Sequence, residues 1–263
     1  MKIAGETVLL TGATGGVGRA LAARLAEAGA HLIVTGRDGE ALRALADRLG
    51  ARWVTADLAD PEDVEHLAKE CAGTAILVAN AALPASGDLL EYTPDQVDRA
   101  LAVNLRSAVV LARLLAPAMT EAGRGHLVFV GSMSGKAATP HSSLYTASKF
   151  GLRGFAHALR LDLRPAGVGV SLVQPGFVAD AGMFARTGAP LPRGARAVTP
   201  DQVASAVLRA IAHDRGEINI APLKLRLRCA LSVQFPSVAA WLQGQGAPDD
   251  TGRRIVDAQR ASR

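Results

Sequence analysis

Aromatic side chains are scarce in this chain of 263 residues, where phenylalanine, tryptophan and tyrosine together make up 4%. Proteins that hold single-stranded nucleic acid stack its bases on aromatic rings, so we expect no nucleic-acid partner. The formal net charge of +5 does not reverse this expectation. A positive balance fits a phosphate-bearing ligand, but it is also an ordinary property of a solvated surface.

Cysteine is nearly absent as well. Cys71 and Cys229 are far apart and form no Cys-x-x-Cys motif, and the six histidines include no pair at metal-ligand spacing. The sequence therefore predicts neither a disulfide framework nor a metal site, and it suits a cytoplasmic location. Glu6 interrupts the apolar residues near the N-terminus. Because no stretch of about 18 uncharged apolar residues follows, we expect neither a signal peptide nor a spanning helix.

What the sequence does contain is a regular alternation of short apolar runs with longer segments rich in alanine, leucine and arginine. Leu21 and Leu25 illustrate the helical spacing, and Gly50 and Gly167 stand where helices should end. Alternating strands and helices predict a parallel sheet covered on both faces. We therefore expect a doubly wound, mostly parallel α/β fold of seven strands, at residues 7–11, 31–35, 52–56, 74–79, 126–131, 168–174 and 217–220.

A glycine-rich segment, TGATGGVG, connects the first expected strand to the first helix at residues 11–18. Glycines there permit a tight turn and let backbone N–H groups approach a pyrophosphate at the positive end of the helix. Gly18 would also let the helix pack closely on the sheet. The alternative is a purely structural turn, but the position between strand and helix favours dinucleotide binding.

The spacing TGxxxGxG resembles that of the short-chain dehydrogenase/reductase family, and further motifs of that family follow in order over residues 6–220. The resemblance implies a Rossmann-type fold and hydride transfer between a nicotinamide and an alcohol or ketone carbon. The implied catalytic residues are Ser132, Tyr145, Lys149 and Asn104. In this scheme Tyr145 exchanges the hydroxyl proton, Ser132 holds the substrate oxygen, and Asn104 supports a proton relay.

Tyr145 and Lys149 are four residues apart on an expected helix, so their side chains share a face. A free phenol has a pKa near 10, and a neighbouring ammonium should lower that pKa toward the range useful for acid–base catalysis. An exposed helical pair is the alternative. For Ser132 the alternatives are a serine that closes a turn, or a role taken by Ser134.

In the family that this chain resembles, the residue at the end of the second strand differs between members that use NAD and members that use NADP. Members that use NAD have an acidic residue there to bind the ribose hydroxyl, whereas this chain has Gly36 followed by Arg37. A guanidinium can pair with a 2′-phosphate, and Arg19 adds charge. We therefore expect NADP(H) rather than NAD(H), although Asp38 nearby weakens the case.

The resemblance also assigns the other cofactor contacts. Asp57 would meet the adenine, and Asn80 would tie strands together. Members usually carry a threonine where this chain has Asp180, so the role of Asp180 stays open. The expected cofactor-binding residues are Gly12, Thr14, Gly16, Val17, Gly18, Arg37, Asp57, Leu58, Asn80, Tyr145, Lys149, Pro175, Gly176 and Val178.

We expect residues 1–221 to form the dinucleotide-binding and catalytic domain and residues 222–263 a helical extension with a frayed end. A loop at about 177–199 is rich in glycine and proline, which favours a substrate lid over a plain surface excursion. Its apolar residues, with Met133 and Leu144, predict a pocket for an apolar alcohol or ketone; they are Phe177, Met183, Phe184 and Leu191.

The segment 222–246 mixes leucines with Lys224, Arg226 and Arg228. We expect it to pack on the cleft or form a subunit contact in a homodimer or homotetramer, ahead of a membrane-surface role. Two rival functions remain for the whole chain. One is an NADP-binding regulator or scaffold without catalysis, and the other is a nucleotide-sugar epimerase, for which the residues after position 220 are too few.

Overall fold

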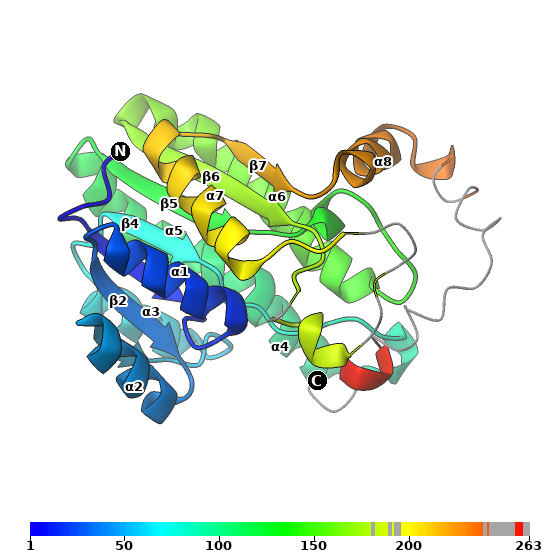
Figure 1. Ribbon diagram of the computed structural model, residues 1–263, viewed down its shortest axis with the longest axis horizontal. Helices are drawn as coiled ribbons and strands as arrows, with labels where there is room; N and C mark the ends of the chain where they lie inside the picture. The colour runs from blue at the N-terminus through cyan, green and yellow to red at the C-terminus, as the bar shows by residue number, and fades with distance from the viewer. Residues whose placement is uncertain (180–181, 189–190, 192–195, 239–240, 242–255, 260–263) are drawn as a thin grey trace.

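The structure is a computed structural model that describes residues 1–179, 182–188, 191, 196–238, 241 and 256–259. Its seven strands form one sheet in the order β3-β2-β1-β4-β5-β6-β7 (Figure 1). Every neighbouring pair is parallel, which confirms the predicted fold class. The strands are β1 Thr7–Thr11, β2 His31–Gly36, β3 Arg52–Thr55, β4 Ile76–Ala79, β5 Gly125–Val130, β6 Val168–Pro175 and β7 Glu217–Ile220.

Helices cover both faces of the sheet, because successive strand residues point to opposite sides. On β1, Val8 and Leu10 belong to the core beneath α1, α2 and α7, whereas Leu9 belongs to the core beneath α3, α5 and α6. The helices are α1 Gly16–Glu27, α2 Gly39–Leu49, α3 Pro61–Glu70, α4 Pro94–Leu101, α5 Ser107–Glu121, α6 Ser143–Leu163, α7 Pro200–His213 and α8 Leu223–Gln234.

The strand order reverses between β1 and β4. The chain runs from β1 outward to β3, then returns to place β4 on the other side of β1. In open parallel sheets, ligands bind in the crevice that such a reversal leaves outside the carboxyl ends of the strands. The glycine-rich segment and Asn80 both follow strands that border this crevice, so the topology brings them together.

One continuous helical stretch in the described residues, Pro94–Glu121, is long and apolar enough to cross a membrane by length and composition alone. It consists of α4, a π-helical turn at Ala102–Arg106, and α5. Half of its most apolar window is buried inside the fold. Leu111 and Leu115 of α5 belong to the core beneath the sheet, so the stretch has the character of a core helix.

The last two helical segments of the described chain differ in where they lie. The helix α8 lies outside the layers, beyond β7 (Figure 1). Residues 256–259 form a helical turn whose Val256 and Gln259 are buried, and Gln259 Oε1 accepts a hydrogen bond from Ser86 N at 3.3 Å. A buried contact with the loop after β4 thus holds these four residues.

Candidate active site

The glycine-rich segment is built for close backbone approach. Gly12 has a φ of +64°, and a Cβ there would lie 2.8 Å from Ala81 Cα. A Cβ on Gly18 would lie 2.1 Å from the Gly12 carbonyl oxygen, so α1 packs against the turn only because residue 18 is glycine. Within the described chain, α1 has no side-chain cap and no acidic residue in its first turn. Its N-terminus can therefore receive an anion.

Asn80 and Thr11 fasten β4 to β1 at the crevice. Asn80 Nδ2 donates to the carbonyl oxygens of Thr11 at 3.1 Å and Gly12 at 3.2 Å. In return, Thr11 Oγ1 accepts hydrogen bonds from the backbone N–H groups of Asn80 and Ala81, both at 3.0 Å. The predicted tie between strands is present, and it fixes the curvature of the glycine-rich turn.

Two guanidinium groups lie near the end of β2. Arg37 is exposed directly after β2, and Arg19 Nε donates to the Thr14 carbonyl at 3.0 Å, which holds Arg19 against the glycine-rich turn. Asp38 caps α2, since its carboxylate accepts a hydrogen bond from Ala41 N at 3.0 Å. The N-terminus of α2 thereby offsets part of the Asp38 charge, so Asp38 repels a nearby 2′-phosphate less strongly than a carboxylate without such a partner would.

Asp57 follows β3, and its carboxylate already has partners. Oδ1 accepts from Ala59 N at 3.0 Å, and Oδ2 accepts from Arg99 Nη2 at 2.8 Å. Burial alone would raise the pKa of Asp57, but these hydrogen bonds and the charges of Arg99 and Arg37 outweigh it and lower the pKa. Leu58 beside it is buried. Asp57 is therefore a fixed anion at the rim of the crevice.

Ser132 and Tyr145 meet at the carboxyl end of β5. Ser132 lies two residues beyond β5, and its Oγ accepts a hydrogen bond from Ser134 N at 3.1 Å. The Ser132 hydroxyl lies close enough to the Tyr145 phenol to lower the pKa of Tyr145 in part. The backbone N–H of Ser134 thus supports the Ser132 hydroxyl.

Lys149 lies one helical turn beyond Tyr145 on α6. Its side chain is 3% exposed, and Nζ donates to the Val130 carbonyl at 3.1 Å. Nζ is 5.7 Å from the centre of the Tyr145 ring. Burial lowers the pKa of Lys149 to about 8, because the charged ammonium loses its hydration.

The pKa of Tyr145 is raised in the structure, and this direction is opposite to the one that the sequence predicts. Burial is the largest cause, and the hydrogen bond from Ser132 offsets only part of it. The sequence places Lys149 on the same helix face but does not reveal how much water the fold removes from the phenol. At neutral pH the Tyr145 hydroxyl therefore holds its proton, as a general acid must.

Asn104 lies in the π-helical turn between α4 and α5 and is 2% exposed. Its side chain clamps the Leu83 backbone: Oδ1 accepts from Leu83 N at 2.6 Å, and Nδ2 donates to Leu83 O at 3.0 Å. Single π-helical turns inside α-helices are frequent at functional sites. The structure thus gives Asn104 a positioning contact with the loop after β4.

The segment after β6 forms the base of the expected lid. Gly176 N donates to the Ile220 carbonyl at 2.9 Å, and Val178 pairs with Val198 in a parallel bridge that closes the loop at its root. Above this bridge the Phe177 and Phe184 rings lie 4.9 Å apart, centre to centre. Asp180 lies outside the described residues.

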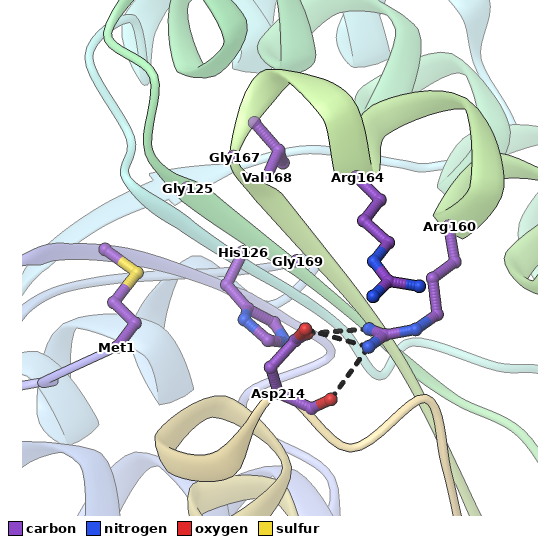
Figure 2. Close-up of a pocket in the computed structure, with 9 residues that line it drawn as sticks. All are labelled: Met1, Gly125, His126, Arg160, Arg164, Gly167, Val168, Gly169 and Asp214. Carbon is purple, nitrogen blue, oxygen red and sulfur yellow. Dashed lines mark hydrogen bonds and ion pairs between the residues drawn. The ribbon is translucent and has the colours of Figure 1, made fainter.

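A separate hollow lies at the amino ends of β5 and β6, away from the carboxyl ends that border the candidate site. It has a volume of about 220 Å³. Figure 2 shows the Arg160 guanidinium paired with the Asp214 carboxylate, beside the buried His126 ring. The lining residues include none that the sequence predicts for the site; they are Met1, Gly125, His126, Arg160, Arg164, Gly167, Val168, Gly169 and Asp214.

Residues 6–190 match the family described as short chain dehydrogenase, which is more than half of the chain. The chain belongs to this family. Its relatives include the ketoacyl reductase HetN of Nostoc, which is 34% identical over 226 residues, covering 82% of this chain and 78% of the relative. A 1-deoxy-11-beta-hydroxypentalenate dehydrogenase of Streptomyces exfoliatus is 37% identical over 230 residues, covering 82% of each protein.

A solved short-chain dehydrogenase from Sphingobium yanoikuyae, in complex with NADPH, has a TM-score of 0.77 and 30% identity with this chain. The match covers 93% of this chain and 99% of that one. The likeness therefore extends past the region of the family match, into the segment that carries β7 and α8.

Sequence reasoning missed two groups around this short-chain dehydrogenase site. One is Arg99, whose partner Asp57 is 42 positions away along the chain. The other is a network at Glu217, which pairs with Lys136, Arg153 and His157. Lys136 directly follows the short helical turn that Ser132 caps, so the network holds the end of this turn in place. No local motif marks either group.

Proposed function

We propose that this chain is an NADP(H)-dependent oxidoreductase that interconverts an alcohol and a ketone, with Tyr145 as the proton donor or acceptor. The observation that carries the proposal is the buried Lys149 ammonium, whose Nζ lies 5.7 Å from the centre of the Tyr145 ring, with the Ser132 hydroxyl near the phenol. A protonated phenol and a second hydroxyl can together hydrogen-bond a ketone oxygen as negative charge develops on it.

NADP(H) is supported by the charges around the end of β2. Arg37 and Arg19 offer guanidinium groups that suit a phosphate, and Asp38 is engaged as the cap of α2. The NADPH complex of the Sphingobium relative supports the same choice. The glycine-rich turn, the N-terminus of α1 and Asn80 would hold the pyrophosphate, while Asp57 and Leu58 lie where the adenine is expected. When bound, the reduced cofactor supplies the hydride.

The chain's own residues handle the proton. In the direction of ketone reduction, Tyr145 Oη donates its proton to the substrate oxygen while Ser132 holds that oxygen in place. Lys149, when charged, stabilises the phenolate that Tyr145 becomes. Asn104 keeps the loop after β4 in position and supports the path by which the phenol regains a proton. In the direction of alcohol oxidation the phenol must first lose its proton, which the raised pKa of Tyr145 disfavours at neutral pH.

We infer that the substrate is apolar. The Phe177 and Phe184 rings contact each other at a tilt near the root of the lid, and Met133 and Leu144 are buried beside Ser132 and Tyr145. Apolar walls with a few polar groups are typical of sites for small organic ligands. A cytoplasmic location and a homodimer or homotetramer belong to the same proposal, supported by two free, buried cysteines and by the family.

The test is oxidation of NADPH and of NADH, followed by absorbance, across ketones of increasing size. We expect net oxidation of NADPH with bulky aliphatic or cyclic ketones, and a slower rate with NADH. NADPH binding without turnover across the panel would favour a catalytically silent regulator instead. Substrate conversion without any net change in absorbance would favour an epimerase, because such enzymes recycle their cofactor within each cycle.

A further inference from the structure

Three leucine side chains of the helix α8 face solvent rather than the body of the protein. Its inward face is short and consists of Leu225, Cys229 and Ser232, of which Cys229 is 3% exposed. The opposite face carries Leu223, Leu227 and Leu231, and these are 65%, 57% and 60% exposed. A surface helix of a soluble domain normally turns its apolar stripe toward the core. In α8 the stripe of three leucines points outward.

The apolar surface continues past the end of the helix. Phe235, Val238 and Trp241 are 58%, 54% and 63% exposed. Exposed apolar groups that gather in one region mark an interaction surface, whereas single ones are ordinary. We call the outward stripe of α8 together with these three residues the C-terminal apolar face.

Cations border this face on both sides. Placed at 100° per residue, Lys224 and Arg228 follow the leucine stripe on one flank and Arg226 lies on the other, and all three are exposed. The sequence has no aspartate or glutamate from position 218 to position 248. The segment that forms the C-terminal apolar face therefore carries basic residues and no acidic ones.

We propose that the C-terminal apolar face docks on an anionic phospholipid surface, with α8 lying in the plane of the interface. An amphipathic helix with leucines on one face and cations beside them binds by apolar burial together with attraction to acidic headgroups. Trp241 and Phe235 suit the boundary between headgroups and acyl chains. The charges thus match this occupant in sign, and the leucines match it in polarity.

A second copy of the chain fits the same face less well. In a symmetric contact each patch meets its own copy, so Lys224, Arg226 and Arg228 would face the same cations of the partner. No acidic residue from 218 to 248 is present to neutralise them. We therefore place a lipid surface ahead of a subunit contact for this segment.

Docking would also orient the catalytic edge of the sheet. Leu225 Cδ2 lies 3.6 Å from the point that a Cβ on Gly176 would occupy, so α8 adjoins the root of the lid. A docked α8 would hold the carboxyl end of β6 near the lipid, from which an apolar substrate can enter. This consequence rests on the proposed function, whereas the docking itself does not depend on catalysis.

The experiment is cosedimentation of the full chain with vesicles of phosphatidylcholine, with and without about one third phosphatidylserine. The triple variant Lys224→Gln, Arg226→Gln, Arg228→Gln is compared with a control, Arg48→Gln, Arg113→Gln, Arg209→Gln, which removes three exposed charges from the folded body. Each cation near an acidic membrane adds about a fivefold factor to binding. We expect the α8 triple variant to partition roughly a hundredfold more weakly, and the control within threefold of wild type.

Two further variants sharpen the result. Leu227→Gln with Leu231→Gln should abolish partitioning without changing the oligomeric mass. In a Trp53→Phe background, which leaves Trp241 as the single tryptophan of the chain, the emission should shift to shorter wavelength on acidic vesicles. A Tyr145→Phe variant should partition like wild type, so failure of docking and failure of the proposed enzymatic function are read separately.

Three outcomes would overturn the proposal. The first is equal partitioning of wild type and the α8 triple variant, and the second is equal binding to vesicles with and without phosphatidylserine. The third is a loss of oligomeric mass in the Leu227→Gln, Leu231→Gln variant while its partitioning is unchanged. That last result would assign the C-terminal apolar face to a second copy of the chain.

Discussion

At the scale of single residues, the proposed chemistry depends on how burial sets two pKa values in opposite directions. Removing water raises the pKa of the Tyr145 phenol and lowers that of the Lys149 ammonium to about 8. The phenol thus keeps its proton at neutral pH, and the lysine stays largely charged only below about pH 8. In the proposed reaction, these two directions favour delivery of a proton over its removal.

This arrangement predicts the pH profile of ketone reduction. We expect kcat/KM to be level near neutral pH and to fall as the pH rises through about 8, where Lys149 loses its charge. The fall should approach tenfold per pH unit, since the uncharged amine no longer stabilises the phenolate. Initial rates of NADPH oxidation in overlapping buffers check this. A profile that stays level up to the ordinary phenol pKa of about 10 would show that Lys149 is not the controlling group.

Arg37 allows a second prediction at the same scale. Arg37→Ala should weaken NADPH binding by about tenfold or more, because it removes a charge-assisted hydrogen bond to a phosphate, and it should leave NADH binding nearly unchanged. Fluorescence titration with each cofactor measures both. The matched control is Arg43→Ala, an exposed arginine on α2 whose partner is Asp47. Equal losses for both cofactors would remove Arg37 from the 2′-phosphate site.

At the scale of secondary-structure elements, the Glu217 carboxylate of β7 joins this strand to α6 and to Lys136, which follows the helical turn after β5. Glu217 is 16% exposed and pairs with Lys136, Arg153 at 3.0 Å and His157 at 2.8 Å. Burial alone would raise its pKa, but hydrogen bonds from Lys136, Asn219 and His157 outweigh burial and hold the pKa at about 2. Stability from this group is present above the unfolded pKa and is lost as the pH falls from 4.5 through about 2.

Glu217→Gln should therefore lower the free energy of unfolding by about 3 kcal/mol at neutral pH, because it leaves the half-buried cations of Lys136 and Arg153 without their counter-charge. Urea unfolding followed by circular dichroism measures the change. Glu70→Gln is the control: Glu70 pairs with Arg52 at 2.7 Å, but its side chain is 46% exposed. A surface pair of this kind should cost below about 1 kcal/mol. Equal costs for the two variants would mean that Glu217 is no more than a surface ion pair.

The sequence predicts the elements well where the information is local. All seven strands were placed from apolar runs, with shifts of one or two residues at some ends. Gly18 was expected at a close approach, and the structure leaves no room for a Cβ there. By contrast, the Asp57–Arg99 pair and the Glu217 network join residues far apart in the chain. Their partners depend on the order of strands in the sheet, which no local spacing reveals.

The same limit applies to the pKa of Tyr145 and to α8. Spacing puts Tyr145 and Lys149 on one helix face, but the amount of water removed from the phenol is a property of the packed fold. In α8 the leucines and cations alternate so closely that the sequence does not tell which face meets the body. Only the burial of Cys229 and the exposure of Leu227 settle the orientation.

At the scale of the whole molecule, we expect the buried His126, at the amino end of β5, to make the fold sensitive to acid. His126 is 2% exposed, and its Nε2 is 2.8 Å from Ser171 Oγ. Burial lowers its pKa from 6.5 to about 4, with Asp214 opposing the shift. Between these values the unfolded chain binds a proton that the folded chain does not. The contribution of His126 to the free energy of unfolding is therefore fully present above pH 6.5 and is lost as the pH falls from 6.5 through about 4.

We expect the free energy of unfolding to fall by about 3 kcal/mol over that range because of His126. In His126→Gln this part of the slope should disappear, while His66→Gln, a change at an exposed histidine on α3, should keep it. Urea unfolding at half-unit steps of pH gives the slopes. An unchanged slope in His126→Gln would place the acid sensitivity elsewhere in the molecule.

The central claim is that the Tyr145 hydroxyl exchanges a proton with the substrate oxygen. It is tested most directly by single-turnover oxidation of NADPH by excess enzyme on a ketone that the wild type reduces, with Tyr145→Phe compared at several pH values. The account predicts, at saturating NADPH, a rate lower by about 10²–10⁴-fold and loss of the fall in rate above about pH 8. A Tyr145→Phe variant that reduces the ketone within about twofold of the wild-type rate would contradict it.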